Sequence, residues 1–284
     1  MIDLHMHSVL SDGSDEPEVL ADLAASVGCS TIALTDHDRL DGIERLRAHA
    51  STVGVTVIGG CELSCAVSYD VPGVRPVLHI LVYFVEPGEG ALHEELIRQM
   101  AFRRDRNERL VGRLRSLGID VTFDDLVAAA GKVDGIGRPH VAQVLVEKGV
   151  VATIQEAFDT WLAKGRPGYV EREEMTADVA LRLAKESGGV AVIAHPLSLG
   201  LAGESFANAL TELRGLGLSG MECVYGRYSK AERHALSQTA RRLSMVATGG
   251  SDYHGTYKPD LRVGVGRGDL RVPDAVIAEL VARR

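Results

Sequence analysis

Short runs of β-branched and aliphatic residues recur along this chain, and amphipathic segments lie between them. Runs of this length are typical of buried strands, whereas apolar positions spaced three and four apart are typical of helices. The predicted strands are Ile2–Met6, Thr31–Thr35, Val55–Gly59, Val77–Phe84, Gly189–Ala194, Gly220–Val224 and Met245–Thr248. Predicted helices follow Pro17, Asp38, Thr176, Gly203, Ser229 and Pro273. These repeating units predict an α/β fold in which seven mostly parallel strands close into a barrel.

The alternation breaks between Phe84 and Val190, where the pattern is mostly helical. The helices predicted there are Leu92–Leu117, Phe123–Ala130, Pro139–Lys148 and Thr153–Ala163. Glycines near both ends of this stretch mark joints at which a scaffold tolerates an insertion. We therefore expect a barrel built from 1–86 and 167–284, and a helical insert, 87–166, that covers the active site.

Composition narrows the class of protein. The chain has 284 residues, 45% of them hydrophobic and 25% charged, which is typical of a folded globular protein. A net charge of -8 argues against a broad nucleic-acid-binding or membrane-binding surface, although a local basic patch is compatible with it. The four cysteines lack metal-site spacing, the N-terminus lacks a secretory pattern, and no apolar run reaches about 18 residues. We expect a cytoplasmic protein without a membrane or an obligate protein partner.

Histidines and carboxylates gather at the ends of the predicted strands. They lie in the segments His5-Met6-His7, Asp36-His37-Asp38, Cys61-Glu62-Leu63, Ala194-His195-Pro196 and Asp252-Tyr253-His254, together with Asp12 and His79. In a barrel of parallel strands these ends share one face, the face on which active sites are built. The alternative, ordinary histidines with hydrogen-bond partners, would require many such residues to coincide by chance. Imidazoles mixed with carboxylates suit Mn, Zn or Fe, so we expect a multinuclear metal site.

The same segments resemble the motifs of the PHP family (polymerase and histidinol phosphatase) over residues 1–84 and 189–268. The resemblance implies a distorted (β/α)7 barrel with a trinuclear metal site. Within the family, the motif order and the helical insert are most similar to nucleoside 3′,5′-bisphosphate phosphatases and to 5′-to-3′ exoribonucleases such as RNase AM.

The resemblance also implies how the ligands divide among three ions. One ion would be held by His5, His7, Glu62 and Asp252, a second by Asp12, His37 and His254, and a third by Glu62, His79 and His195. Relatives often have His at the position of Asp12, and a carboxylate there favours Mn²⁺, with Zn²⁺, Fe²⁺ or Mg²⁺ as alternatives. Candidates for proton transfer are His37, His195 and His254, but a histidine that binds a metal is a poor acid, so this role stays open.

The first predicted helix of the insert carries seven arginines between Arg98 and Arg115. A helical wheel places Arg104 and Asn107 on an otherwise apolar, inward-facing stripe with Ile97, Met100, Val111 and Leu114. Buried polar groups need partners, and a guanidinium fork matches phosphate oxygens. The alternative is a solvated charged helix. The candidate substrate contacts are Asp12, Arg103, Arg104, Asn107, Arg138, His140 and His254.

These features together predict a metal-dependent phosphatase acting on nucleoside 3′,5′-bisphosphates, such as adenosine 3′,5′-bisphosphate, and on short RNA from the 5′ end. Two alternatives remain: a histidinol phosphatase, and a metal-binding regulatory module without activity. A metal-dependent amidohydrolase commonly has a bridging lysine, and none of the six lysines lies in the barrel motifs.

Overall fold

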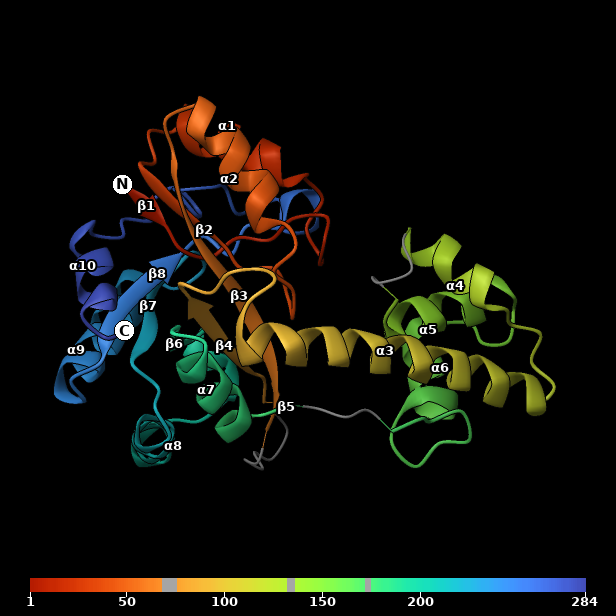
Figure 1. The fold of residues 1–284 in the computed structure, drawn as a ribbon. Helices are drawn as coiled ribbons and strands as arrows, with labels where there is room; N and C mark the ends of the chain where they lie inside the picture. Colours follow the sequence, from red (N-terminus) through yellow and green to blue (C-terminus); the bar gives the residue numbers. More distant parts are fainter. Residues whose placement is uncertain (68–75, 132–135, 172–174) are drawn as a thin grey trace. The chain divides into compact units, whose positions relative to one another are not determined.

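The computed structural model describes residues 1–67, 76–131, 136–171 and 175–284. The chain forms two compact units. The barrel unit comprises Met1–Glu94 and Glu174–Arg284, and the helical unit comprises Glu95–Glu173. Figure 1 shows the elements of both units along the chain.

The strands of the barrel unit form one sheet. They are β1 (Ile2–Asp3), β2 (Thr31–Leu34), β3 (Thr56–Ala66), β4 (Leu78–Tyr83), β5 (Met175–Thr176), β6 (Val190–Ile193), β7 (Gly220–Tyr225) and β8 (Val246–Gly250). The order is β1-β2-β3-β4-β6-β7-β8, and the two-residue β5, which the sequence pattern did not predict, pairs with β3. A hydrogen bond from the Leu4 amide to the Gly249 carbonyl, 3.3 Å, connects the chain after β1 to β8. The predicted seven-stranded barrel is therefore confirmed.

One strand runs against the others. β4 pairs antiparallel with both β3 and β6, whereas the pairs β1–β2, β2–β3, β6–β7 and β7–β8 are parallel. The expectation of a mostly parallel barrel holds. Because β4 is reversed, its first residues lie at the same end of the barrel as the last residues of its parallel neighbours.

Helices cover the outside of this sheet (Figure 1). They are α1 (Pro17–Ser26), α2 (Ile43–Thr52), α7 (Ala177–Glu186), α8 (Gly203–Gly215), α9 (Lys230–Arg242) and α10 (Ala275–Val281). Within this layer α2 packs on β3, α7 on β6 and α9 on β7. The helix-start signals predicted these positions well: Ser229 caps α9 by accepting a hydrogen bond from the Glu232 amide.

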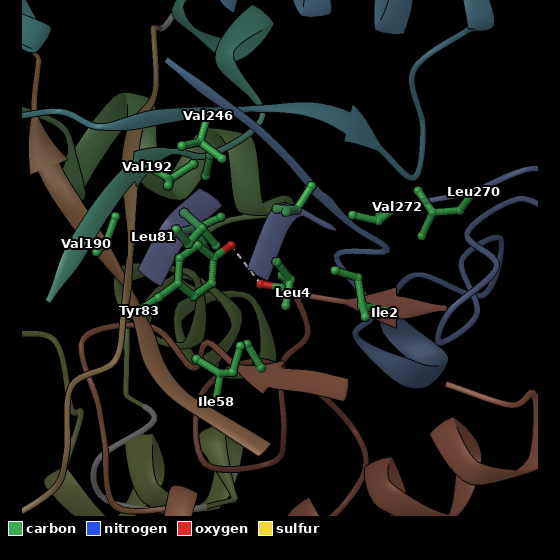
Figure 2. Packing of buried hydrophobic residues seen from close by; sticks show 14 residues of the cluster. Ile2, Leu4, Ile58, Leu81, Tyr83, Val190, Val192, Val246, Leu270 and Val272 are labelled. Carbon is green, nitrogen blue, oxygen red and sulfur yellow. Dashed lines mark hydrogen bonds between the residues drawn. The ribbon is translucent and has the colours of Figure 1, made fainter. Parts of the chain in front are cut away.

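Aliphatic side chains fill the barrel below the ends of its strands (Figure 2). Leu4, Leu81 and Val192 are fully buried there, and each contributes roughly 1.5–3 kcal/mol by leaving water. Tyr83 completes this core, and its hydroxyl donates a hydrogen bond of 2.9 Å to the Leu4 carbonyl. The floor of the barrel is thus apolar and closely packed.

Glycine at position 250 permits the barrel to close. A Cβ atom added to Gly250 would lie 2.4 Å from the Cβ of His5, closer than two carbon atoms can approach. The backbones of β8 and of the segment after β1 therefore come together only because residue 250 has no side chain. This close approach places His5 at the strand ends.

The helical unit has its own core. Its elements are α3 (Gly90–Ser116), which begins in the barrel unit, α4 (Phe123–Ala130), α5 (Arg138–Glu147), α6 (Ile154–Ala157) and a π-helical turn, Phe158–Leu162. Leu110, Leu114, Leu126 and Leu145 meet in a cluster of buried side chains. The four helices predicted for the insert are present, the last one divided between α6 and the π turn. Of the helices that can be described, none is long and apolar enough to cross a membrane.

Candidate metal centre

Backbone pairing at the strand ends brings the histidine motifs together. After β1 the chain stays extended: Met6 bridges to Tyr253, and the His7 amide bonds the Tyr253 carbonyl at 2.9 Å. His37, just beyond β2, bridges to Glu62. The sequence pattern ended the third strand at Gly59, but β3 continues to Ala66, so Glu62 lies within a strand and is held rigidly.

His79 reaches the same end of the barrel for a different reason. It is the second residue of β4 and pairs with Ser64 of β3. The sequence pattern predicts that His79, like the other five histidines of the cluster, lies at the end of a parallel strand, and for His79 this is wrong because β4 is antiparallel. The reversal still brings its imidazole to the cluster, where Nδ1 lies 2.9 Å from Oε1 of Glu62.

The described residues contain three overlapping groups whose ligand atoms all lie within 4.8 Å of one another. The groups are His5, His7, Glu62 and Asp252; His7, Asp12, His37 and His254; and His37, Glu62 and His79. Shared members join them into one cluster, which we call the mouth cluster and which also includes His195 through its contact with Glu62. Ligands bound to one ion at about 2.0–2.2 Å lie roughly 3.0–3.5 Å apart, which is the spacing of many of these atoms.

Glu62 is the central residue of the mouth cluster. Its Oε2 lies 3.1 Å from Nε2 of His5, 3.0 Å from Nε2 of His7 and 3.5 Å from Nε2 of His37. Its Oε1 lies 2.9 Å from a ring nitrogen of both His79 and His195. The two oxygens thus face two different sets of imidazoles, which is the arrangement of a carboxylate that bridges two ions.

Hydrogen bonds outside the mouth cluster orient its imidazoles. Nδ1 of His254 donates to the Asp252 carbonyl at 2.9 Å, and Nδ1 of His195 lies 3.0 Å from the Ser198 hydroxyl. In both rings Nε2 faces a carboxylate of the cluster. It lies 3.3 Å from Asp12 in His254 and 2.9 Å from Glu62 in His195. Metal-binding histidines usually have such a partner on the second nitrogen.

The buried carboxylates of the cluster need positive charge beside them, either from protonated imidazoles or from metal ions. Burial acts to raise the pKa of Glu62, but His37, His5 and His79 hold it well below its ordinary value. Burial acts to lower the pKa of His7, yet contacts with Asp252 and Glu62 raise it to about 9. Without metal, protons on the imidazoles therefore neutralise the buried carboxylates, a task that divalent cations can take over.

His37 has the form that a metal ligand needs. Burial is the main cause that lowers its pKa to about 4, so the ring is neutral at pH 7. Its buried Nδ1 also has no hydrogen-bond partner among the residues that the structure describes. The orphaned nitrogen and the donor set of imidazoles and carboxylates both fit divalent transition-metal ions.

Asp12 completes the cluster from a loop. Its side chain is 53% exposed, and its oxygens lie 3.4 Å from His7 and 3.7 Å from His37. These imidazoles and His254 lower the pKa of Asp12, although burial opposes the shift. Asp12 is the most accessible carboxylate of the cluster and the one best placed to meet an incoming molecule.

Backbone strain is concentrated at the cluster. His195 and Asp252 have φ values of 27° and 56°, in the left-handed region that non-glycine residues rarely adopt. A hydrogen bond of 2.8 Å from the Asp252 amide to the His5 carbonyl holds the second of these turns. Strain of this kind persists where surrounding contacts impose it, commonly at functional sites.

Sequence reasoning missed three residues that support the cluster. They are Glu222, which contacts His5 at 2.9 Å, and Tyr225 and Lys258, which both donate to Oδ2 of Asp252, at 2.7 and 2.6 Å. Asp36, which the sequence did place at a strand end, accepts a hydrogen bond of 2.6 Å from the Ser8 hydroxyl. Glu222 could have been found, because it is an acid inside an otherwise apolar predicted strand. Lys258 lies outside the histidine motifs, and its position by Asp252 had no sequence signal.

Arg104 does not face inward. Its side chain is 64% exposed and pairs with Glu108 at 3.4 Å, and Ile97, on the same predicted stripe, is 52% exposed. The predicted inward position of these two residues is wrong, although Asn107, Val111 and Leu114 of the same stripe are buried. Arg106, 7% exposed, takes the buried position next to Asn107 instead. The pattern was ambiguous since long polar side chains occupy both faces of this helix.

The other insert candidates lie on α3 and at the start of α5. Asn107 donates to the Ile136 carbonyl at 3.1 Å, and the Arg138 guanidinium stacks on the ring of Tyr169. Nδ1 of His140 accepts a hydrogen bond from the Gly137 amide at 3.0 Å and so caps α5. The structure thus brings Asn107 to the segment that contains Arg138 and His140, while Arg103 occupies α3 one turn before Asn107.

Known structures share this fold. An amidohydrolase from Chromobacterium violaceum, described with bound sulfate and no metal, is 30% identical with a TM-score of 0.77, and the match covers 99% of this chain and 96% of that one. A candidate metal-dependent phosphoesterase from Bifidobacterium adolescentis is 28% identical with a TM-score of 0.74 and the same coverage. Together with the mouth cluster, the matches define the chain as a metal-dependent phosphoesterase.

The family follows from the sequence matches. The PHP domain profile matches residues 3–171, and the chain belongs to the PHP family. A 3′,5′-nucleoside bisphosphate phosphatase of Chromobacterium violaceum is 32% identical over 89% of this chain and 87% of its own. A 5′-3′ exoribonuclease of Haemophilus influenzae is 30% identical over 89% of both chains. A phosphoribosyl 1,2-cyclic phosphate 1,2-diphosphodiesterase of Eggerthella lenta is 32% identical over 90% of this chain and 94% of its own.

Proposed function

We propose that this protein is a phosphatase that removes the 3′-phosphate from nucleoside 3′,5′-bisphosphates and leaves the nucleoside 5′-monophosphate. The observation that carries the proposal is the mouth cluster, in which Glu62 faces two sets of imidazoles from opposite sides. The similarity to a bisphosphate phosphatase and to an exoribonuclease supports a nucleotide substrate, and short RNA is a second substrate of the same chemistry.

Three Mn²⁺ ions are proposed for the mouth cluster. The ligands of the first are His5, His7, Glu62 and Asp252, those of the second are Asp12, His37 and His254, and those of the third are Glu62, His79 and His195. When bound, such ions supply an activated water at neutral pH and neutralise charge on the phosphoryl oxygens. Asp12 is exposed on a loop, and its oxygens lie 3.4 Å or more from His7 and His37. This carboxylate can therefore adjust its position to both ion and substrate.

The chain's own residues then fix the substrate and manage its protons. Asp12, 53% exposed, lies at the accessible side of the cluster, and the buried His254 contacts it at 3.3 Å. These two residues are proposed to orient the phosphoryl group. His37, His195 and His254 are the candidates for moving a proton to the leaving oxygen. A histidine tied to an ion is a poor acid, so the proton donor among them stays open.

The helical unit is proposed to bind the anionic part of the substrate. Arg103, Arg104, Asn107, Arg138 and His140 are the candidate contacts. At the start of α5 the backbone amides and the Arg138 guanidinium form the type of environment that binds phosphate. Arg104 is exposed, and its surface pair with Glu108 contributes at most about 1 kcal/mol, so a phosphate can displace it.

A panel of substrates tests the proposal. Phosphate release is measured with Mn²⁺ on adenosine 3′,5′-bisphosphate, adenosine 5′-monophosphate, histidinol phosphate and ribose 1,2-cyclic phosphate 5-phosphate. For a short 5′-phosphorylated RNA, the release of nucleoside 5′-monophosphates is measured instead. The bisphosphate should give the highest kcat/KM. His254→Ala serves as the inactive variant, and His49→Ala, a surface histidine paired with Asp22, is the matched control.

The outcomes separate the alternatives. Preference for histidinol phosphate would make the protein a histidinol phosphatase, and preference for the cyclic phosphate would place it with the diphosphodiesterase relative. No turnover of any substrate by protein with bound metal would favour a binding module without activity.

A further inference from the structure

Glu222 is a charged residue buried in the middle of the barrel. It lies on β7 in the apolar segment Gly-Met-Glu-Cys-Val-Tyr, and its side chain is 0% exposed. In the strand register it stands opposite Thr248 of β8. A buried carboxylate is costly unless it is hydrogen-bonded, so its contacts indicate what it does.

Its two oxygens contact two different cluster histidines. Oε1 lies 2.9 Å from Nδ1 of His5, and Oε2 accepts a hydrogen bond of 2.7 Å from the backbone amide of His195. These residues come from opposite parts of the sequence, one after β1 and one after β6. Glu222 therefore ties two strand ends together beneath the mouth cluster.

The first contact selects one form of the His5 ring. A carboxylate can only accept hydrogen bonds, so Nδ1 of His5 carries the proton and donates it to Glu222. Nε2 is then the nitrogen directed at the cluster, 3.1 Å from Glu62 and 3.2 Å from His7. Glu222 thus presents the correct nitrogen of His5.

The second contact stabilises a strained turn. His195 has φ 27° and ψ 59°, a strained conformation for a residue with a side chain. The charge-assisted bond from its amide to Glu222 helps hold this turn. This backbone turn directs Nε2 of His195 to Glu62, 2.9 Å away.

We propose that Glu222 is a positioning residue that sets the ring form of His5 and the backbone turn of His195, and so prepares two ions of the cluster at once. The proposal rests on the metal centre proposed above. Glu222 does not touch the substrate; it acts through the two histidines.

Glu222→Gln tests this role without changing the shape of the side chain. An amide has one accepting oxygen and one donating nitrogen, so it cannot accept from both His5 and His195. If the amide oxygen keeps its hydrogen bond with the His195 amide, the NH₂ group faces Nδ1 of His5 and donates to it. The ring proton of His5 must then move to Nε2, the nitrogen that is needed by the metal. The matched control is Thr248→Val, a buried replacement of equal shape on the neighbouring strand, opposite Glu222, to which the Thr248 hydroxyl makes no hydrogen bond.

Metal binding is the first measurement. Metal-free wild type, Glu222→Gln and Thr248→Val are titrated with Mn²⁺, and bound metal is counted after dialysis. Glu222→Gln should bind its weakest ions about 10- to 100-fold less tightly than wild type, whereas Thr248→Val should match wild type. Affinities within threefold of wild type for Glu222→Gln, or an equal loss in Thr248→Val, would overturn the proposal.

The ring proton of His5 is the second measurement, and its result in the wild type tests the proposal even where the variant does not fold. In Zn²⁺-loaded wild type with ¹⁵N-labelled histidine, the Nδ1 proton of His5 should be visible and slow to exchange, and it should vanish in Glu222→Gln. Its absence from wild type would overturn the proposal. Failure of wild type to bind any metal would instead refute the proposed metal centre, so the two failures are distinguishable.

Discussion

Replacing Glu62 by Gln removes the central charge of the mouth cluster while keeping its shape. The carboxylate is 1% exposed and contacts the imidazoles of His5, His7, His37, His79 and His195. At the 3.0 Å that separates Oε2 from Nε2 of His7, one ion pair is worth about 5 kcal/mol at an effective dielectric constant of about 20. Desolvation offsets part of this, and removing one partner of a buried pair typically costs about 3–5 kcal/mol.

The loss should depend on pH. The pKa of His7 is raised to about 9, so at pH 6.5 the ring is charged, and Glu62→Gln removes one of the carboxylates, with Asp252, that stabilise this charge. We expect metal-free Glu62→Gln to lose about 3 kcal/mol of unfolding free energy at pH 6.5. At pH 9.5 the ring is mostly neutral, and the difference from wild type should shrink to below about 1 kcal/mol.

Denaturant unfolding at both pH values measures this difference, and phosphate release with Mn²⁺ measures the functional loss. Turnover should fall by more than about 100-fold because the proposed bridge between ions is gone. The control is Glu86→Gln, the same exchange at a surface carboxylate paired with Arg47. The reasoning is refuted if the two variants are equally stable at pH 6.5, or if Glu62→Gln keeps activity within tenfold of wild type.

Three further predictions follow from the same geometry. Asp252→Ala or His254→Ala should abolish turnover and leave circular dichroism unchanged; activity within about tenfold of wild type would contradict the ligand assignment. Because the pKa of His7 is raised, its protonation stabilises the metal-free protein fully below pH 6.5, and about 3 kcal/mol should be lost as the pH rises past 9. A melting temperature that is flat over this range would contradict it. Arg104→Ala should lower kcat/KM for phosphorylated substrates more than Arg109→Ala, which breaks a similar exposed pair on the same helix; equal values would mean that Arg104 only faces solvent.

The barrel could be predicted because its signals are local. Each strand is a short apolar run, and each cluster residue follows or interrupts one, so the pattern located His5 and Asp252 without any tertiary information. The reversal of β4 could not be read in this way, since an apolar run has the same composition in either direction. His79 lies in the cluster because it is near the start of an antiparallel strand, which the apolar pattern does not reveal.

The supporting residues were harder to predict because they act through space. Glu222 and Lys258 contact His5 and Asp252 from positions far along the chain, and only the closed barrel brings them together. The face of α3 was misjudged for another reason. With arginines on every side, the helix gives a weak apolar stripe, and Arg104 could not be told apart from Arg106 by spacing alone.

The mouth cluster is proposed to hold the ions that perform the chemistry. Protein stripped with a chelator, then dialysed and reloaded with increasing Mn²⁺, tests it when bound metal and phosphate release from adenosine 3′,5′-bisphosphate are measured on the same samples. Activity should be absent in the stripped protein and should return in step with metal, up to three ions per chain. Full activity in the stripped protein, or metal that binds equally well to Asp252→Ala, would contradict the account.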